Sequence, residues 1–364
     1  VRVGGVLVGT AQPHEDILVG TTANEHILSG ELDDNIGGRG GKDWIEAGAG
    51  RDYVVGDEGD DLIEGGAGAD ILGGDDNDDR IYGNIKIATA AAIVNGNTDT
   101  ASGLKGDWLA GNAGNDTLVA GADNDVLTGG AGLDLLIAGA GDDFILGDAD
   151  YTPQFIIEST WRYNEGGIDW YHTSSAPFDW TVTPQDAAFH FAPVDGETDP
   201  AGGGADVIYA GKGKDHAWGG VGNDVVFGEE GEDTLFGEEG NDILIGGVGV
   251  DTIRGGAGRD TYVFNKGDGV DTIIDDDTGP EKSILVFGEG FDKDSIKLRK
   301  GSLLLDLGDG DAIHIDNFDA DNPLASQSFA SFQFADGSSL TWNELLARGF
   351  DLDGTEGNDT ILGT

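Results

Sequence analysis

Short apolar stretches recur along this chain at a spacing of nine residues, and a stretch rich in glycine and acidic residues separates each from the next. From residue 201 the sequence runs in nine-residue units such as GGVGNDVVF, GEEGEDTLF and GEEGNDILI. The last three residues of a unit alternate as in a short β-strand, so the apolar middle residue faces inward. The residues at this inward place are Ile45, Val54, Ile63, Leu72, Ile81, Leu118, Leu127, Leu136, Ile145, Ile208, Val226, Leu235, Leu244 and Ile253, while Ala217 and Tyr262 depart from the aliphatic pattern.

Glycines at the second and fourth places of a unit predict a tight turn between successive strands. Gly220 and Gly222 are examples, and glycine at these places allows a positive φ and a close approach of neighbouring backbones. A turn, a three-residue strand, a second turn and a second strand make one coil of about 18 residues. Stacked coils form two parallel sheets with turns along both edges, so we predict an all-β chain.

Aspartate occupies the sixth place of the units in three separate runs. Because aspartate accounts for 52 of the 364 residues, a chance run of seven at one place is about one in a million, which indicates a true repeat. These aspartates are the candidate metal ligands: Asp43, Asp52, Asp61, Asp70, Asp79, Asp107, Asp116, Asp125, Asp134, Asp143, Asp206, Asp215, Asp224, Asp233, Asp242, Asp251 and Asp260.

The stacking of the coils brings sixth-place aspartates of alternate units together. Asp206 is expected above Asp224, and Asp215 above Asp233. Carboxylates and main-chain carbonyls of two stacked turns would enclose a cation with oxygen alone, which selects calcium over zinc, iron or copper, and over the stricter octahedron of magnesium. We predict one ion per stacked pair, about 11 if the runs are separate and about 15 if the stack is unbroken.

The composition supports a specific acidic repeat over a disordered tail or a merely acidic surface. The chain has 65 glycines and a net charge of -51, and aspartate outnumbers glutamate 52 to 18. This charge argues against nucleic acid as a partner, because phosphate binding needs basic patches. The absence of cysteine excludes disulfides and thiolate ligands. No apolar run approaches the roughly 20 residues of a membrane span.

These units resemble the G-G-x-G-x-D-x-U-x signature of RTX (repeats-in-toxin, haemolysin-type calcium-binding) proteins, in about 17 copies over more than about 150 residues. The resemblance implies a parallel β-roll with calcium bound between turns. It also implies export by a type I secretion system and a secreted, extracellular or cell-surface location. We expect calcium to be needed for folding, because each unit buries one aliphatic side chain at roughly 1.5–3 kcal/mol, whereas ordering nine backbones costs about 9–18 kcal/mol.

Several units depart from the pattern. Asn77 and Asp123 replace the fourth-place glycine, and both residue types tolerate a left-handed backbone, so we expect these turns to survive. His26 is placed where an aspartate would be, in poorly formed rows of residues 9–37. We therefore expect residues 1–37 to be a degenerate cap.

Two segments interrupt the repeat. Residues 83–105 are expected to be a looped-out insertion. Residues 149–200 carry ten aromatic residues and five of the eight prolines. A clasp packed on the side of the roll is the first interpretation, because buried aromatics are common. The alternative is a glycan or cell-surface ligand site, for which Trp161, Trp170 and Trp180 are the candidate residues.

The last part of the chain changes character and predicts a small β-rich cap domain. Its GDGD and ADG stretches mark hairpins, and residues 343–348 followed by Gly349 predict a short helix. The stretches GEGFDKDSIKL, LLLDLGDGDAIHIDNF and FADGSSLTW resemble the calcium-binding-protein-related domain found between RTX arrays. GTEGNDTILGT then begins a new repeat, and the first residue is Val1, so we expect a piece of a longer protein.

The pattern divides the chain into eight segments. They are 1–37, the degenerate cap; 38–82, a β-roll block; 83–105, an insertion loop; 106–148, a second β-roll block; 149–200, the aromatic insertion; 201–275, a third β-roll block; 276–349, the C-terminal domain; and 350–364, the start of the next array.

No motif of a catalytic site is present. HExxH, GxSxG and GxxxxGK[ST] do not occur, so we expect no enzyme activity in this chain. The favoured hypothesis is a calcium-dependent structural module of a large secreted bacterial protein, adhesin-like and associated with a surface or matrix. Two alternatives stay open: a calcium-binding tail of a secreted toxin or enzyme whose catalytic part lies elsewhere, and a carbohydrate-binding module acting through residues 149–200.

Overall fold

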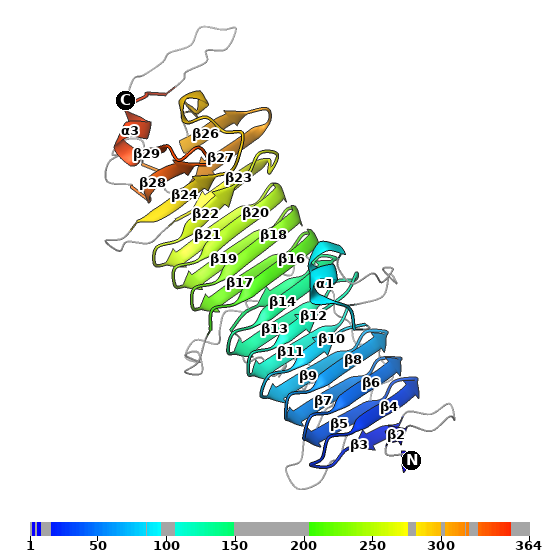
Figure 1. The fold of residues 1–364 in the computed structure, drawn as a ribbon. Coiled ribbons are helices and arrows are strands. Elements are labelled where there is room, and N and C mark those ends of the chain that lie inside the picture. Colours follow the sequence, from blue (N-terminus) through cyan, green and yellow to red (C-terminus); the bar gives the residue numbers. More distant parts are fainter. Residues whose placement is uncertain are drawn as a thin grey trace.

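A computed structural model shows a solenoid in which the chain winds between two long, facing sheets (Figure 1). It describes residues 2–3, 6–8, 16–84, 86–95, 106–148, 204–275, 282–299, 303–316, 318–319 and 327–350. Neighbouring strands of the roll are parallel and are mostly 18 residues apart in sequence, so that Val226 pairs with Ile208 on one side and Leu244 on the other. The predicted all-β parallel β-roll is confirmed.

The described strands form two sheets. The first contains, in spatial order, β1 (Arg2–Val3), β2 (Val6–Val8), β4 (His26–Glu31), β6 (Trp44–Ala49), β8 (Leu62–Ala67), β10 (Arg80–Tyr82), β12 (Thr117–Val119), β14 (Leu135–Ala140), β16 (Val207–Gly213), β18 (Val225–Gly231), β20 (Ile243–Gly249), β22 (Thr261–Phe264), β24 (Ser283–Phe287), β28 (Phe329–Phe334) and β29 (Ser339–Thr341). The second contains β25 (Lys297–Arg299), β26 (Leu303–Gly308), β27 (Asp311–Ile315), β23 (Val270–Ile274), β21 (Thr252–Ala257), β19 (Thr234–Glu239), β17 (His216–Val221), β15 (Phe144–Leu146), β13 (Val126–Ala131), β11 (Trp108–Ala113), β9 (Ile71–Asp76), β7 (Tyr53–Glu58), β5 (Asn35–Gly40) and β3 (Ile17–Val19).

Most strands of the roll are six or seven residues long, not three as predicted. Each continues through the first three places of the following unit, and the main-chain pairing continues with it, as Gly48 against Gly66 shows. Both of these second-place glycines have a positive φ. An added Cβ on Gly66 would lie only 1.9 Å from the carbonyl oxygen of Gly48. Glycine therefore extends the pairing by letting the two backbones approach closely.

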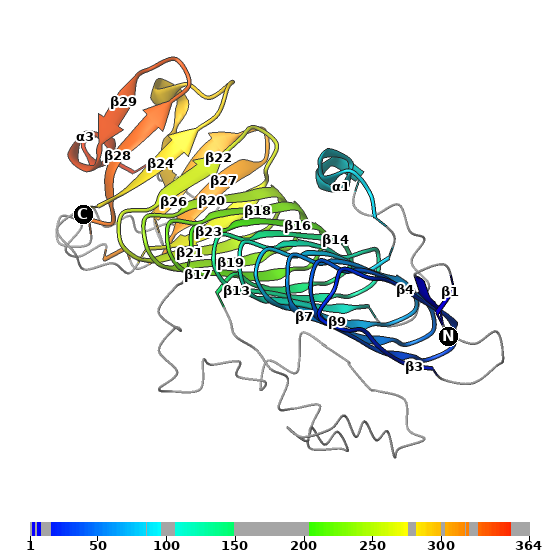
Figure 2. The same cartoon turned by 60° about the horizontal axis from the view of Figure 1, so that its bottom comes forward.

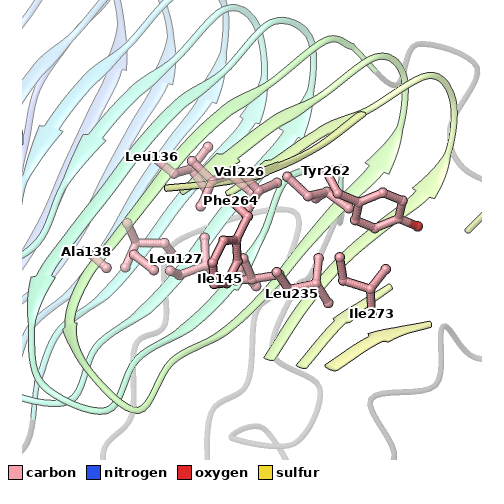
Figure 3. Close-up of a cluster of buried hydrophobic side chains, with 14 of the residues drawn as sticks. Leu127, Leu136, Ala138, Ile145, Val226, Leu235, Tyr262, Phe264 and Ile273 are labelled. Carbon is pink, nitrogen blue, oxygen red and sulfur yellow. The ribbon is translucent and has the colours of Figure 1, made fainter. Parts of the chain in front are cut away.

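The inward side chains form two facing rows between the sheets, one from each sheet (Figure 3). Leu136 and Val226 of one row face Leu127, Ile145 and Leu235 of the other, and all are fully buried. Ala217 and Tyr262, which depart from the aliphatic pattern, are buried in the same rows. The roll thus has about one buried aliphatic side chain per strand, as the sequence predicts.

The two insertions leave the stack unbroken. Ile81 before the first insertion pairs with Leu118 after it, and Leu136 pairs with Ile208 across the second. The first insertion contains a helix, α1 (Thr89–Asn95), where a loop was expected. Figure 2 shows α1 outside the roll, and its Ala92 is buried in an apolar cluster with side chains of the first sheet. The burial of this apolar face explains why a helix replaces the expected loop.

The rows that precede Asp43 are regular from residue 16 onward, contrary to the expectation of a degenerate cap. Ile27 and Ile36 occupy the inward place and are buried. The register of β4 places Glu25, not His26, at the sixth place, because the Glu25 N–H donates to Asp43 Oδ1. His26 lies one place later and stacks on Trp44 with ring centroids 4.1 Å apart.

The C-terminal strands extend the roll and are not a separate layer. β24 pairs in parallel with β22, and β27 with β23, so both sheets continue past residue 276. The predicted hairpins are present as β26–β27 and β28–β29. The predicted short helix is α3 (Trp342–Leu346), whose first turn is closed by a reciprocal capping box between Thr341 and Glu344. A 3-10 turn, η1 (Lys293–Ser295), precedes β25.

Within the described part of the chain, no helix combines the length and the apolar composition that crossing a membrane requires.

Candidate metal centres

Each sixth-place aspartate ends a turn and directly precedes a strand, and these aspartates stack along both edges of the roll. The N–H of Asp206 donates to Oδ1 of Asp224 at 2.8 Å, and the N–H of Asp215 donates to Oδ1 of Asp233 at 3.0 Å. The carbonyl oxygen of Asp206 accepts from the N–H of Val225. The main chain of the preceding coil therefore fixes the position of each accepting carboxylate.

All 17 predicted aspartates lie in these two columns, in 15 stacked pairs that the same hydrogen bond joins. One column contains Asp52, Asp70, Asp107, Asp125, Asp143, Asp215, Asp233 and Asp251, and the other contains Asp43, Asp61, Asp79, Asp116, Asp134, Asp206, Asp224, Asp242 and Asp260. Bonds from Asp70 to Asp107 and from Asp134 to Asp206 carry the columns across the two insertions. The stacking corresponds to the unbroken array for which the sequence predicts about 15 ions.

The columns also contain acidic residues outside the three runs. The closing pattern FNKGDGVDTIIDDD suggests Asp268, Asp271 and Asp275 as further ligands, whereas Asp16, Glu25 and Asp34 were not assigned from the sequence. Asp16 and Asp34 continue one column before Asp52, and Glu25 continues the other before Asp43. At the far end Asp271 accepts from the N–H of Asp251. Counting nine residues back from Asp43 would have found Asp34.

The second carboxylate oxygen of most of these aspartates is buried and accepts no hydrogen bond. Among the described residues this holds for Oδ2 of Asp34, Asp43, Asp52, Asp61, Asp70, Asp79, Asp116, Asp134, Asp143, Asp206, Asp215, Asp224, Asp233, Asp242 and Asp251. A buried carboxylate oxygen without a partner is costly, because burial removes water without replacing it. A column of such oxygens is therefore a set of positions for cations.

At several of these free carboxylate oxygens a main-chain oxygen of the next coil lies close by. A Cβ added to the first-place Gly237 would lie 2.3 Å from Oδ2 of Asp242 and 2.5 Å from the carbonyl oxygen of Gly255. A Cβ on Gly228 would lie 2.6 Å from Oδ2 of Asp233 and 2.4 Å from the carbonyl oxygen of Gly246. The carboxylate and the carbonyl of the next coil thus converge on a space that glycine leaves open.

The electrostatics of the columns favour a bound cation or a bound proton. Burial is the main cause that raises the pKa of Asp79 to about 9, and it raises the pKa of Asp206 and Asp233 to about 8. Neighbouring carboxylates of the same column raise these values further, while the hydrogen bond from the preceding main chain lowers them. The ionised columns are thus unfavourable without a compensating positive charge.

The donor set fits calcium. In the described part of the chain no three acidic or histidine side chains lie close enough together to hold a metal by themselves, so each site combines aspartate with main-chain carbonyls. Carboxylate and carbonyl oxygens in an irregular arrangement are the ligands that calcium takes. The other candidate residues, Trp161, Trp170 and Trp180, lie outside the described residues.

Sequence comparison identifies the repeat. The profile of the RTX calcium-binding nonapeptide repeat (4 copies) matches residues 19–54, 28–63, 37–72, 55–85, 102–136, 122–151, 200–235, 227–262 and 236–273, which together exceed half of the chain. A search of curated proteins found no match. The profile therefore covers the columns from Glu25 to Asp271, including most of the rows that precede Asp43.

Two solved structures show similarity at low sequence identity. One is the extracellular lipase LipA from Serratia marcescens, with 16% identity, a TM-score of 0.24, and coverage of 88% of this chain and 40% of the lipase. The chain thus spans less than half of the length of that enzyme. The other is a hyperactive, Ca2+-dependent, β-helical antifreeze protein from an Antarctic bacterium, with 16% identity, a TM-score of 0.36, and coverage of 93% and 98%.

Proposed function

This chain belongs to the family of RTX calcium-binding nonapeptide repeats, and on that premise we propose that calcium is the switch that folds it. Membership makes the chain a calcium-binding structural module of a kind found in secreted proteins. The observation that supports a switch is the double column of buried carboxylates whose Oδ2 atoms accept no hydrogen bond. These groups make the folded state depend on a ligand that the unfolded chain cannot organise.

The apolar interior of the roll buries too few side chains to hold the columns of carboxylates together by itself. One buried aliphatic side chain per strand contributes roughly 1.5–3 kcal/mol, and the stacked carboxylates oppose the packing of successive coils. Bound calcium would neutralise these carboxylates and link adjacent coils through shared oxygen ligands. Asp Oδ2 and the first-place carbonyl of the next coil, as in Asp242 with Gly255, are the groups that would hold each ion.

A calcium-dependent fold suits a protein that is exported before it folds. Proteins of this family leave the cell through type I secretion systems. Extracellular calcium modules bind at about 0.1–1 mM, so a chain of this type stays unfolded in a cytosol that contains far less calcium. Linked sites then fill together outside the cell, and folding follows export.

The full protein is proposed to act at a surface or in a matrix, as an adhesin-like molecule for which this module is a stiff spacer. Support comes from the long unbroken stack (Figure 1) and from the lack of catalytic motifs in the sequence, so we propose that this part of the protein is not an enzyme. The alternative is a role as the tail of a secreted enzyme or toxin. The sequence of the rest of the protein would distinguish the two roles. Glycan binding through residues 149–200 stays a prediction, because those residues lie outside the described part of the chain.

The calcium switch is tested by far-ultraviolet circular dichroism during a calcium titration of the intact chain. We expect a steep transition from coil to β-structure in the millimolar range or below, with magnesium at equal concentration as the matched control that gives little folding. A chain with the full β-signal in excess chelator would refute the switch.

A further inference from the structure

One turn in the middle of the array is built differently from its neighbours. In the turn of residues 120–125, the N–H of Gly121 donates to Oδ2 of Asp125 at 2.9 Å. Oδ1 of Asp125 accepts from the N–H of Asp107 at 2.6 Å, as in the other turns. Both oxygens of this carboxylate therefore have main-chain donors, which sets Asp125 apart from the aspartates with a free Oδ2.

The backbone explains the difference. In the matched turn of residues 138–143, the second-place Gly139 and the fourth-place Gly141 have φ values of 115° and 154°, and Oδ2 of Asp143 has no hydrogen-bond partner. Neither Gly121 nor Asp123, at the same two places, has a positive φ. Asn77 does adopt the left-handed conformation at the fourth place, with φ 84°, as expected from sequence, whereas Asp123 does not.

A second turn, at the start of the array, also has a main-chain N–H that donates to its acidic side chain. The N–H of Thr21 donates to Oε2 of Glu25 at 2.6 Å, and its hydroxyl donates to Oε1 at 2.7 Å. Neither Thr21 nor Ala23 has a positive φ. The loss of the left-handed backbone and the capture of the carboxylate by the second-place N–H therefore occur together in both turns.

The N–H of Gly121 lies beside Oδ2 of Asp125, where a cation would otherwise bind. Its partial positive charge satisfies the oxygen, and it would repel a metal ion that approached the same oxygen. Nearby, the side-chain amide of Asn84 lies so close that a Cβ added to Gly121 would be 2.6 Å from Nδ2. This turn is thus closed by donors rather than open to a cation.

Apolar side chains pack on the outside of the roll beside the turn of residues 120–125. Val119, directly before this turn, is buried in a cluster with Tyr82, Ile137 and Ala92 of helix α1. This cluster lies on the outer face of the first sheet, where β10, β12 and β14 are neighbours. The closed turn of residues 120–125 therefore directly follows a strand that the helix of the first insertion covers.

We propose that the turn of residues 120–125 binds no calcium and that Asp123 is the residue that determines this. The proposal uses the calcium binding of the family and concerns which turns of this chain take part in it. The column that contains Asp107, Asp125 and Asp143 is then interrupted at Asp125, and helix α1 supplies stability there in place of an ion.

Native mass spectrometry of the intact chain at saturating calcium tests this by counting bound ions. Asp125→Asn should keep the wild-type number, whereas the matched variant Asp143→Asn, in the same column and also preceded by a first-place alanine, should lose at least one ion. Asp123→Gly, which restores a residue that favours the left-handed backbone, should gain at least one.

Loss of an ion in Asp125→Asn to the extent seen in Asp143→Asn would overturn the metal-free turn. An unchanged count in Asp123→Gly would overturn the assignment of Asp123. The glycine variant adds no side chain, so it still decides the question if an asparagine variant does not fold. A chain that bound no calcium at all would contradict the calcium switch instead, which keeps the two proposals distinguishable.

Discussion

The repeat coils and the C-terminal strands share two sheets, yet different forces hold them together. In the coils from β16 to β21, each strand buries one inward residue of modest size, such as Val226 or Leu235, beside a buried carboxylate. In the C-terminal part, β24, β28 and helix α3 add large aromatic side chains to aliphatic residues such as Leu303 and Ile313. Phe287, Phe329, Phe332, Phe334 and Trp342 pack together there, with Phe332 and Trp342 ring centroids 6.1 Å apart. A single sheet can thus pass from stabilisation by ions to stabilisation by apolar burial.

The charged groups of the two regions show the same contrast. Burial raises the pKa of Asp233 in the roll to about 8. The hydrogen bond from Arg299 instead lowers the pKa of Asp306 in β26, with Nη2 and Oδ2 2.8 Å apart. The roll therefore carries acidic groups that need a bound cation. In the C-terminal strands, Arg299 supplies the positive charge for Asp306.

The largest expected effect comes from pH in the absence of calcium, because it acts on all coils together. The pKa values of Asp79, Asp206 and Asp233 are raised to about 9, 8 and 8, from an ordinary 3.8. Between about pH 4 and pH 9 the folded roll then binds more protons than the unfolded chain, so its stability falls as pH rises.

Circular dichroism in chelator, without urea, should therefore show more β-structure at pH 5 than at pH 8. With calcium present the order should reverse, because protons compete with the ion for the same oxygens. A β-signal in chelator that grows with pH would show that the carboxylates are stabilised by groups within the protein.

The next largest effect is expected in the aromatic core. Phe332 is fully buried, and Phe332→Ala should lower the free energy of unfolding of this region by about 3–5 kcal/mol through lost burial and a cavity. The loss should be the same in calcium and in chelator, measured by urea denaturation with a probe in the C-terminal strands. Gln333→Ala, at the exposed neighbour, is the control. A loss seen only with calcium would contradict the division into two regions.

A smaller effect is expected at the junction with the second insertion. Asp148 accepts from the N–H of Gly204 at 3.0 Å and from the N–H of Val221, so its carboxylate joins two neighbouring coils. Asp148→Ala should cost about 1.5–3 kcal/mol, as for hydrogen bonds to a charged acceptor. Asp148→Asn, which retains one acceptor oxygen, should cost less. Equal thermal stability of all three proteins in calcium would show that this residue does not hold the junction.

The smallest effect is expected at ion pairs on the surface of the roll. Lys212 and Glu230 form an exposed pair with Nζ and Oε1 2.9 Å apart. Lys212→Ala should change the free energy of unfolding by no more than about 0.5 kcal/mol, because exposed pairs are screened by water and salt. A change above about 1 kcal/mol in calcium-saturated protein would mean that side-chain ion pairs between coils contribute substantially to the stability of the roll.

The sequence predicted what depends on a strict period and missed what depends on packing. The position of aspartates such as Asp224 within the nine-residue period predicted the turns, the two columns and calcium as the bound ion. Helix α1 was missed because it has only seven residues and its apolar residues form one run, TAAAIVN, without a helical period; packing in the cluster with Val119 and Ile137 makes the helix favourable. His26 was misplaced by one residue because Glu25 serves in place of aspartate at that turn.

The continuity of the sheets past residue 276 and the closure of the turn at Asp125 could not be found from the period either. The first depends on pairing between strands far apart in sequence, as β23 with β27. The second depends on whether one residue, Asp123, adopts a left-handed backbone, and aspartate is compatible with either conformation. Local sequence thus defines the repeat, and context determines how each copy is used.

Hydrogen–deuterium exchange of the intact chain, resolved by segment in calcium and in chelator, tests whether ions hold the repeat coils together. The N–H groups of Asp206, Asp215 and Asp224 donate to the aspartates of the next coil and should lose most of their protection in chelator. The amides of β28 should stay protected in both conditions. Equal protection of the repeat with and without calcium would contradict the claim that ions hold its coils together.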